Sequence, residues 1–461
     1  MNSSSIYILV FVQLWLLSLP CRESVCIPSE RETLLKFKNN LNDPSNRLWS
    51  WNHNYTNCCH WYGVLCHNVT SHLLQLHLNT SSSAFNDGYF DWEAYRGFQF
   101  GGEISPCLAD LKHLNYLDLS GNTFLGEGPI PGGIRNLTLL QNLDLSGNSF
   151  SSSIPDCLYG LHRLKLLNLG DNNLHGTISD ALGNLTSLVE LHLSSNQLEG
   201  TIPTSLGNLT SLVELDLSRN QLEGTIPTFL GNLRNLREID LTYLDLSINK
   251  FSGNLFESLG SLSKLSSLFI NDNNFQGVVN EDDLANLTSL KAFDASGNNF
   301  TLKVGPHWIP NFQLIYLDVT SWQIGPNFPS WIQSQNKLQY VGLSNTGILD
   351  SIPTWFWEAL SQVLYLNTQQ IGKVASDFNS FKKSANATEL CVQSMVCGAE
   401  GSVKKFMMES LVKVPANTDP CTMPAPFDPP TLYATLQRKE SSIQQVESWE
   451  KSYWDNQTIT S

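Results

Sequence analysis

Charged residues are scarce in this chain, and those present are mostly acidic. Only 15% of its 461 residues are Asp, Glu, Lys or Arg, and the net charge is −15. A nucleic-acid-binding protein needs clustered Lys and Arg to displace counterions, so this class is excluded. A length of 461 residues is too great for one ordinary compact core, which leaves several domains or an elongated fold.

Long apolar runs are limited to one, at residues 6–19. It matches the hydrophobic core of a secretory signal peptide and is shorter than the roughly 20 residues that cross a bilayer. The alternative is that residues 6–19 form a buried strand or helix of the folded protein. We expect residues 1–24 to be a signal peptide cleaved near residues 21–24, and we expect no membrane anchor later in this chain.

Catalytic motifs are also missing. The sequence contains no P-loop, no kinase glycine loop, no G-x-S-x-G and no H-E-x-x-H. We therefore predict no enzyme and no cofactor. Cys58, Cys59 and Cys66 with His60 and His67 have the residue types of a metal site, but export favours disulfides, so no metal site is predicted.

What the chain does contain is a repeat. From residue 114 to about residue 366 the phrase L-x-x-L-x-x-L-x-L-x-x-N-x-L/F-x-G-x-I-P returns, mostly every 24 residues. Two extra residues precede Asn148, and a five-residue insertion precedes Asn249. The repeat asparagines are Asn122, Asn148, Asn172, Asn196, Asn220, Asn249, Asn273 and Asn298.

The phrase predicts one coil of a solenoid. The two leucines of L-x-L point the same way on a strand, toward a core shared with the next coil. The Asn turns the chain, and its amide can donate to and accept from backbone groups that the turn leaves unpaired. One coil cannot bury its own leucines, so coils must stack. About ten or eleven coils over residues 73–370 would line a concave wall on the order of 50 Å long.

Two features resemble plant extracellular leucine-rich-repeat proteins. Coils end in G-x-I-P, as at residues 200–203 and 224–227, and residues 26–78 resemble the plant amino-terminal cap. The resemblance implies an α/β solenoid, a right-handed superhelix with a parallel concave β-sheet and a disulfide-bonded helical cap at residues 25–72. It also implies the disulfides Cys26–Cys58 and Cys59–Cys66, whereas spacing alone allows three pairings.

The cap helix has its own sequence pattern. Ser29 and Glu32 have the spacing of a capping box ahead of Leu34, Leu35, Phe37 and Leu41, which are spaced as on one helix face. We expect this helix to cover the leucines of the first coil.

Residues 26–370 are most similar to the receptor-like proteins of plant innate immunity. The phrase FGGEISPCLADLKHLNYLDLSGN at residues 100–122, the insertion at 79–100 and the Trp-rich coils at 306–357 carry this likeness. The family implies a non-kinase receptor at the plasma-membrane outer face, or an extracellular form. It would bind a peptide, glycan or protein ligand in defence signalling, with receptor kinases as co-receptors of a membrane form.

Two rival functions stay open. One is a secreted inhibitor of cell-wall-degrading enzymes similar to the polygalacturonase inhibitors, which are anchorless and have about ten repeats. The long first insertion and the lack of their cysteine-paired carboxy-terminal cap argue against it. The other is a developmental peptide receptor.

The chain departs from the family in two places. Residues 371–461 contain no repeat phrase, and we expect an aberrant or disordered end, with a small folded domain and a family variant as alternatives. Trp322 and Thr346 stand where repeat asparagines are expected. We interpret these as irregular turns rather than a binding feature.

Outward-pointing strand residues are the candidate ligand-binding surface. They form an acidic groove with exposed aromatics, although L-D-L-S is also the ordinary repeat consensus. The candidates are Tyr116, Asp118, Asn142, Asp144, Glu190, His192, Glu214, Asp216, Tyr243, Asp245, Phe269, Asp294, Tyr316, Asp318 and Tyr340. The aromatic residues of the 79–100 insertion are a second candidate, with self-packing over the cap as the favoured alternative.

Glycosylation sequons support export. Four of them, at Asn136, Asn184, Asn208 and Asn286, each precede a repeat asparagine by 12 residues and so should share one flank away from the wall. The predicted glycosylation sites are Asn54, Asn68, Asn79, Asn136, Asn184, Asn208, Asn286 and Asn299. Cys107 and Cys157 occupy matching places two coils apart, roughly 10 Å, so we expect free thiols.

Overall fold

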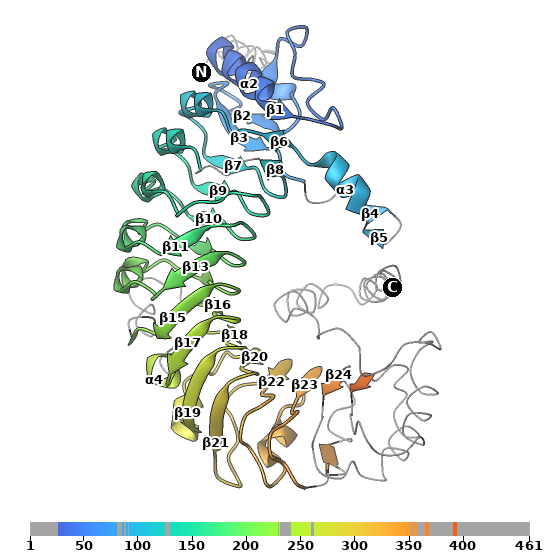
Figure 1. Ribbon diagram of the computed structural model, residues 1–461, viewed down its shortest axis with the longest axis vertical. Helices are drawn as coiled ribbons and strands as arrows, with labels where there is room; N and C mark the ends of the chain where they lie inside the picture. The colour runs from blue at the N-terminus through green and yellow to red at the C-terminus, as the bar shows by residue number, and fades with distance from the viewer. Residues whose placement is uncertain are drawn as a thin grey trace, which may run out of the picture.

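A computed structural model describes residues 26–80, 85–86, 89–90, 92–124, 130–228, 230, 241–259, 262–350, 352–353, 355–356, 365–367 and 391–393. The predicted signal peptide lies outside these residues. The described chain is a curved rod of stacked coils, with the amino-terminal cap at one end (Figure 1). The predicted solenoid with a parallel concave sheet is confirmed.

The inner side of the arc carries a sheet of 14 strands (Figure 1). Its first pair is antiparallel, and the other pairs are parallel. The last strand lies beyond residue 370, where the predicted repeat ends. In order, the strands are β2 (Val64–Cys66), β3 (Leu73–His77), β7 (Tyr116–Asp118), β9 (Asn142–Asp144), β10 (Leu166–Asn168), β12 (Glu190–His192), β14 (Glu214–Asp216), β16 (Tyr243–Asp245), β18 (Ser267–Phe269), β20 (Ala292–Asp294), β22 (Tyr316–Asp318), β23 (Tyr340–Gly342), β24 (Tyr365–Asn367) and β25 (Cys391–Gln393).

A second, parallel sheet of six strands follows the coils toward the outer side of the arc. It comprises β11 (His175–Thr177), β13 (Gln197–Gly200), β15 (Gln221–Thr225), β17 (Lys250–Gly253), β19 (Asn274–Asn280) and β21 (Asn299–Lys303). Short helices close the coils: η2 (Pro106–Asp110), η3 (Gly132–Asn136), η4 (Asp156–Gly160), η5 (Asp180–Asn184), η6 (Thr204–Asn208), α4 (Phe256–Leu259), α5 (Glu281–Leu284) and η8 (Ser330–Ser334).

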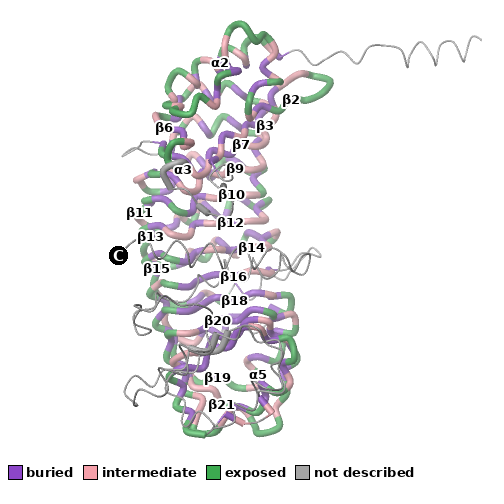
Figure 2. Tube along the Cα trace, turned by 90° about the vertical axis from the view of Figure 1, so that its right-hand side faces the viewer, coloured by how far each residue is buried: buried purple, intermediate pink, exposed green. Residues whose placement is uncertain are grey.

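The leucines form one core that runs along the rod, as the coil physics predicts. Both leucines of each L-x-L phrase are buried, for example Leu191 and Leu193, and Figure 2 shows buried positions recurring in every coil. In the later coils Phe251, Phe275 and Phe300 stack in line with ring centroids 6.2 Å apart. Each coil thus buries its apolar residues against its two neighbours.

The repeat asparagines satisfy the backbone between coils, as predicted. Asn196 donates through Nδ2 to the carbonyls of Leu169, Leu193 and Ser194, and its Oδ1 accepts from the N–H of Leu174. Asn220 repeats the pattern one coil later. Each amide therefore bonds both to its own coil and to the preceding one.

Trp322 and Thr346, which replace the repeat asparagine in two coils, still bond to backbone carbonyls as the asparagines do. Trp322 donates through Nε1 to the Ala295 carbonyl at 2.8 Å, and Thr346 donates through Oγ1 to the Leu343 carbonyl at 2.8 Å. Trp322 also packs on Phe300, with ring centroids 4.8 Å apart. These contacts support the interpretation as irregular turns.

The cap covers the first coil. Its helix α2 (Pro28–Asn39) buries Leu34 and Phe37, while η1 (Cys58–His60) holds two of the bonded cysteines. The disulfides Cys26–Cys58 and Cys59–Cys66 are both present, as implied. Cys107 and Cys157 are free and partly buried.

The predicted capping box is wrong. The cap residue of α2 is Ile27, which makes no side-chain capping bond, and Ser29 lies inside the first turn. Pro28 explains the earlier start, because its fixed φ and missing N–H suit the first helical position.

The insertion after residue 79 contains β4 (Phe85–Asn86), β5 (Tyr89–Phe90) and α3 (Trp92–Phe98), which project on the inner side of the arc (Figure 1). Arg47 of the cap donates to the carbonyl of Phe98 and the hydroxyl of Thr80, and lies over the Phe100 ring. Nearby, β6 (Gly101–Gly102) pairs with β1 (Leu41–Asn42) and β8 (Thr123–Phe124). The end of the insertion therefore packs on the cap.

Candidate ligand-binding wall

The inner wall consists of two rows of side chains, the first and third residues of each three-residue strand. The parallel register aligns these residues from coil to coil, and the central residue points into the core. Every strand residue proposed from the sequence lies in one of these rows. The first row includes Tyr116, Asn142, Glu190, Glu214, Tyr243, Tyr316 and Tyr340, and the third row includes Asp118, Asp144, His192, Asp216, Asp245, Phe269, Asp294 and Asp318.

The aspartates of the third row have a structural task. Asp144 Oδ1 accepts from the N–H and the hydroxyl of Ser146, at 2.9 and 2.6 Å. Asp216 makes the same pair of bonds with Ser218. In the strands that carry it, the L-D-L-S consensus thus closes the turn after the strand, which leaves the second carboxylate oxygen for other partners.

Acidic side chains dominate the part of the wall that we call the acidic section, formed by Asp144, Glu190, His192, Glu214 and Asp216. All five are partly exposed. In register, Glu190 lies opposite Glu214 and His192 lies opposite Asp216. His192 Nε2 is 3.9 Å from Glu190 Oε2 and 3.9 Å from Glu214 Oε2.

Burial and charge shift the titration of this section. Burial and the neighbouring Glu190 raise the pKa of Glu214. Burial also raises the pKa of Asp144, with Asp118 adding to the shift. Burial alone would lower the pKa of His192, but its contact with Glu190 and the charges of Asp216 and Glu214 raise it overall. Negative charge is therefore crowded here, with one imidazole to offset it.

Further along, the wall changes to the aromatic section, formed by Tyr243, Phe269, Ala292, Tyr316 and Tyr340. The sequence predicts exposed aromatics, but the side chains of Phe269, Tyr316 and Tyr340 are 0%, 2% and 3% exposed. The Tyr316 and Tyr340 rings stack with centroids 4.2 Å apart. These rings cover one another across neighbouring strands, which is why they are buried and not exposed as the sequence predicts.

The hydroxyls of Tyr316 and Tyr340 bond the aspartates of the preceding strand, whereas Tyr243 donates to Asp245 Oδ2 of its own strand at 3.3 Å. Tyr316 donates to Asp294 Oδ2 at 3.1 Å, and Tyr340 donates to Asp318 Oδ2 at 3.1 Å. Burial and the charge of Asp318 raise the pKa of Asp294 well above its usual value. The sequence gives Tyr and Asp as separate candidates, whereas the structure joins them into interstrand pairs.

Sequence reasoning missed Asn168 of β10, whose Nδ2 donates to Asp144 Oδ2 at 3.2 Å. It also missed His77 of β3, which stacks on Tyr116 with centroids 4.5 Å apart. Both residues hold the third-row place, so strand position alone could have identified them.

Most predicted glycosylation sites lie at the surface. Asn136, Asn184 and Asn208 are the exposed last residues of η3, η5 and η6, on one flank of the coils, and Asn286 follows α5. Asn54, Asn68 and Asn299 are also exposed, whereas Asn79 is partly buried and donates through Nδ2 to Asp118 Oδ2 at 2.8 Å.

Family models match the cap and most of the coils. A leucine-rich repeat N-terminal domain matches residues 27–67, and leucine-rich repeat models match residues 113–137, 138–198 and 195–324. The chain is a plant-type leucine-rich-repeat protein. A model of glycosyl transferase family 90 also matches residues 376–450, nearly all of which the structure does not describe. The absence of enzymatic activity therefore stays a prediction.

Receptor-like proteins are among the relatives of this leucine-rich-repeat protein, so the predicted likeness is confirmed. Receptor-like protein EIX1 of Solanum lycopersicum is 36% identical over 104 residues, which are 22% of this chain and 10% of that protein. Receptor-like protein EIX2 of the same species is 35% identical over 133 residues, 29% of this chain and 12% of that protein. The matching segments thus span only a small part of these relatives.

Several solved plant proteins share this fold. A plant ice-binding protein has a TM-score of 0.58 at 25% identity and covers 70% of this chain and 97% of its own. The Arabidopsis thaliana receptor-kinase ectodomain GASSHO1/SCHENGEN3, in complex with CASPARIAN STRIP INTEGRITY FACTOR 2, has a TM-score of 0.53 at 28% identity and covers 73% and 44%. The PEPR1-AtPEP1 structure has a TM-score of 0.52 at 28% identity and covers 77% and 54%. Among the residues described in this chain, no helix combines the length and apolar character needed to cross a membrane.

Proposed function

We propose that this protein is an extracellular, receptor-like sensor in plant defence whose acidic section binds a cationic segment of a peptide or protein ligand. The observation that supports this proposal most directly is the strand register, which places Glu190 opposite Glu214. Like charges at opposed strand positions destabilise a sheet, and a ligand ammonium or guanidinium group between them would remove that repulsion. His192, 3.9 Å from both carboxylates, supplies only one partial counter-charge.

Three other observations support this role. The chain has a net charge of −15, which steers cations toward it at low ionic strength. The exposed sequon asparagines at the ends of η3, η5 and η6 lie away from the wall, so glycans there would leave it open. Similar plant ectodomains have been solved as complexes. A membrane-bound form would use receptor-kinase co-receptors, as its family implies.

The test compares an arginine-containing peptide with its citrulline counterpart, which has nearly the same shape and no charge. The purified protein should bind the arginine peptide more tightly, and the preference should weaken with salt. Glu190→Gln with Glu214→Gln should lower the affinity at least about tenfold, since charged hydrogen bonds contribute about 1.5–3 kcal/mol each. The same variant should unfold at a slightly higher temperature, because the repulsion is gone.

Glu199→Gln with Glu223→Gln is the matched control, because these two glutamates are exposed on the other sheet, in β13 and β15. It should leave affinity unchanged. Equal binding of the two peptides, or full binding by the Glu190/Glu214 variant, would refute the proposal. The defence role predicts that this protein also binds elicitor peptides in a pull-down from plant membranes. Inhibition of a fungal pectinase by the protein would instead support the rival function as an inhibitor of cell-wall-degrading enzymes.

A further inference from the structure

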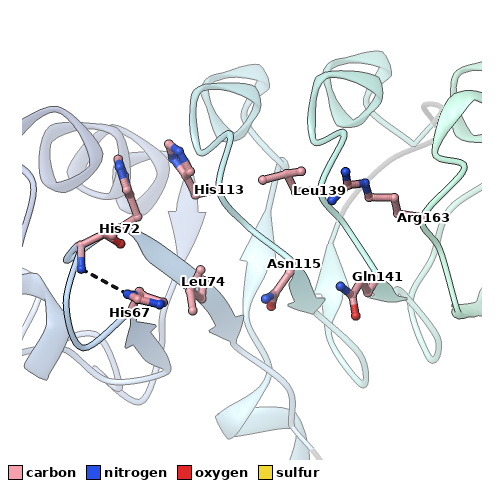
Figure 3. A pocket seen from close by; sticks show the side chains of 9 residues that line it. His67, His72, Leu74, His113, Asn115, Leu139, Gln141 and Arg163 are labelled. Atoms are coloured by element: carbon pink, nitrogen blue, oxygen red, sulfur yellow. Dashed lines mark hydrogen bonds between the residues drawn. The ribbon is translucent and has the colours of Figure 1, made fainter.

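A hollow of about 480 Å³ lies on the side of the first coils, beside the inner wall. Figure 3 shows His72 and His113 at one end, His67 below them and Arg163 at the far end. These side chains come from the cap, from the start of β3 and from the turns before the next strands. The lining residues are His67, Thr70, His72, Leu74, His113, Asn115, Leu139, Gln141 and Arg163.

A buried carboxylate lies beside the two stacked histidines at the end of this hollow. Glu30 of α2 is 6% exposed, and its Oε2 accepts from the N–H of Leu73 at 2.8 Å. Its Oε1 is 3.0 Å from His72 Nδ1 and 3.6 Å from His113 Nδ1. The two imidazole rings stack with centroids 3.5 Å apart. One carboxylate oxygen is therefore shared between two imidazole nitrogens.

The three atoms have the spacing of metal ligands. Two atoms bound to tetrahedral zinc at its usual bond lengths lie about 3.4 Å apart, between the two distances measured here. The three residues each offer one ligand atom within 4.8 Å of those of the other two. A hydrogen bond explains the 3.0 Å contact with His72, but 3.6 Å is too long for a hydrogen bond with His113.

The surroundings also suit a metal ion. The N–H of Leu73 fixes the carboxylate through its other oxygen, which is how outer partners orient metal ligands. His72 and His113 are 31% and 45% exposed at their side chains, so an ion can enter from solvent and the two rings can move out of their stack, which they must do for both Nδ1 lone pairs to point at one ion. The hollow leaves room for water as a fourth ligand.

We propose that Glu30, His72 and His113 bind a divalent transition-metal ion of the zinc class, through Glu30 Oε1 and the two Nδ1 atoms. The ion joins the cap helix, the residue just before β3 and the turn before β7, which are far apart in the sequence. Metal binding then stabilises the junction between the cap and the coils, because the unfolded chain does not hold these three ligands together.

Zn²⁺ and Co²⁺ titrations of chelator-treated protein test this site. Glu190, His192 and Glu214 form another group of suitable atoms, so the titrations use a His192→Gln background. One ion should bind per chain, Co²⁺ should develop the visible absorption of tetrahedral coordination, and Zn²⁺ should raise the unfolding temperature. His113→Gln and His72→Gln should each weaken binding at least about a hundredfold, since losing only an outer partner costs 10–100-fold.

His53→Gln is the matched control, because His53 is an exposed histidine of the same cap. It should bind Zn²⁺ as the background protein does. Circular dichroism of the metal-free variants checks that they fold, and His113→Gln, at the more exposed ligand, remains informative if His72→Gln does not fold. If the background protein binds no more metal than the variants, the three residues are only an ion-pair cluster and the proposal falls.

Discussion

At the residue scale, the side-chain amide of each repeat asparagine links its own coil to the preceding one, as Asn196 and Asn220 do. The position of the asparagine after L-x-L indicates a turn with unpaired backbone groups, and the structure places the amide among them. Asn220→Ala removes the donor to Leu193, Leu217 and Ser218 and the acceptor for the N–H of Leu198. Because buried polar groups lose their partners, we expect a loss of about 3 kcal/mol in unfolding free energy.

Urea denaturation measures this loss, and Gln221→Ala is the control. Gln221 is the exposed neighbour of Asn220, so its replacement should change stability by less than about 0.5 kcal/mol. Equal effects of the two substitutions would contradict the role given to the asparagine.

A second prediction at this scale concerns backbone strain in the residue before each repeat asparagine. This residue adopts the left-handed backbone region in every described coil, and in one coil it is Ile248, at φ 52°. A β-branched residue is strained there by roughly 1–2 kcal/mol, which exceeds the entropy cost of glycine in the unfolded chain. Ile248→Gly should therefore stabilise the protein by about 0.5–1 kcal/mol in thermal unfolding. Arg219→Gly, at φ 53° but unbranched, should gain less, and destabilisation by Ile248→Gly would disprove the strain.

At the element scale, the inner strands could be located from the sequence, but the exposure of their side chains could not. Alternation along a strand assigns Tyr316 and Tyr340 to the wall, and this is correct. It does not reveal that each hydroxyl bonds the aspartate of the preceding strand or that both rings are buried, because these depend on contacts between coils. The capping box failed for the opposite reason, since one local residue, Pro28, sets the helix start.

These buried pairs make the aromatic section sensitive to pH. Burial and Asp318 raise the pKa of Asp294 in the folded protein well above 3.8, its ordinary value, so the folded state holds a proton that the unfolded chain releases. The contribution of the Asp294 carboxyl to the free energy of unfolding is complete below about pH 3.8. It is lost as the pH rises through the pKa that this carboxyl has in the folded protein. Relative to Asp294→Asn, the wild type should lose about 1.4 kcal/mol per unit of pKa difference.

Denaturant unfolding between pH 4 and pH 7 measures this difference. Asp282→Asn changes an exposed carboxylate of α5 and should give a curve parallel to that of the wild type. An increase in wild-type stability relative to Asp294→Asn toward neutral pH would reverse the expected sign.

At the scale of the whole molecule, strand pairing joins each described coil to its neighbours, and the few ring contacts that skip a coil, such as Phe269 with Tyr316, reach no further than nearby coils, so stability is expected to be local. The sequence predicted this architecture because leucines that recur every 24 residues can be buried in no simpler way. The resemblance to plant repeat proteins also implied the disulfide-bonded cap at one end of the rod. It did not reveal the packing inside the cap, where Trp51 stacks on Trp61 with ring centroids 5.6 Å apart.

Loss of the cap disulfides should loosen one end of the rod and leave the other intact. Cys26 and Cys58 are 32 residues apart in sequence and Cys59 and Cys66 only 7, so loop entropy predicts losses of about 4 and about 2.5 kcal/mol on replacement of each pair by serine. Hydrogen exchange should rise in β3 and β7 and stay unchanged in β18 and β20, because no direct contact carries the change so far along the stack. Faster exchange throughout the rod would instead mean that the coils unfold as one cooperative unit.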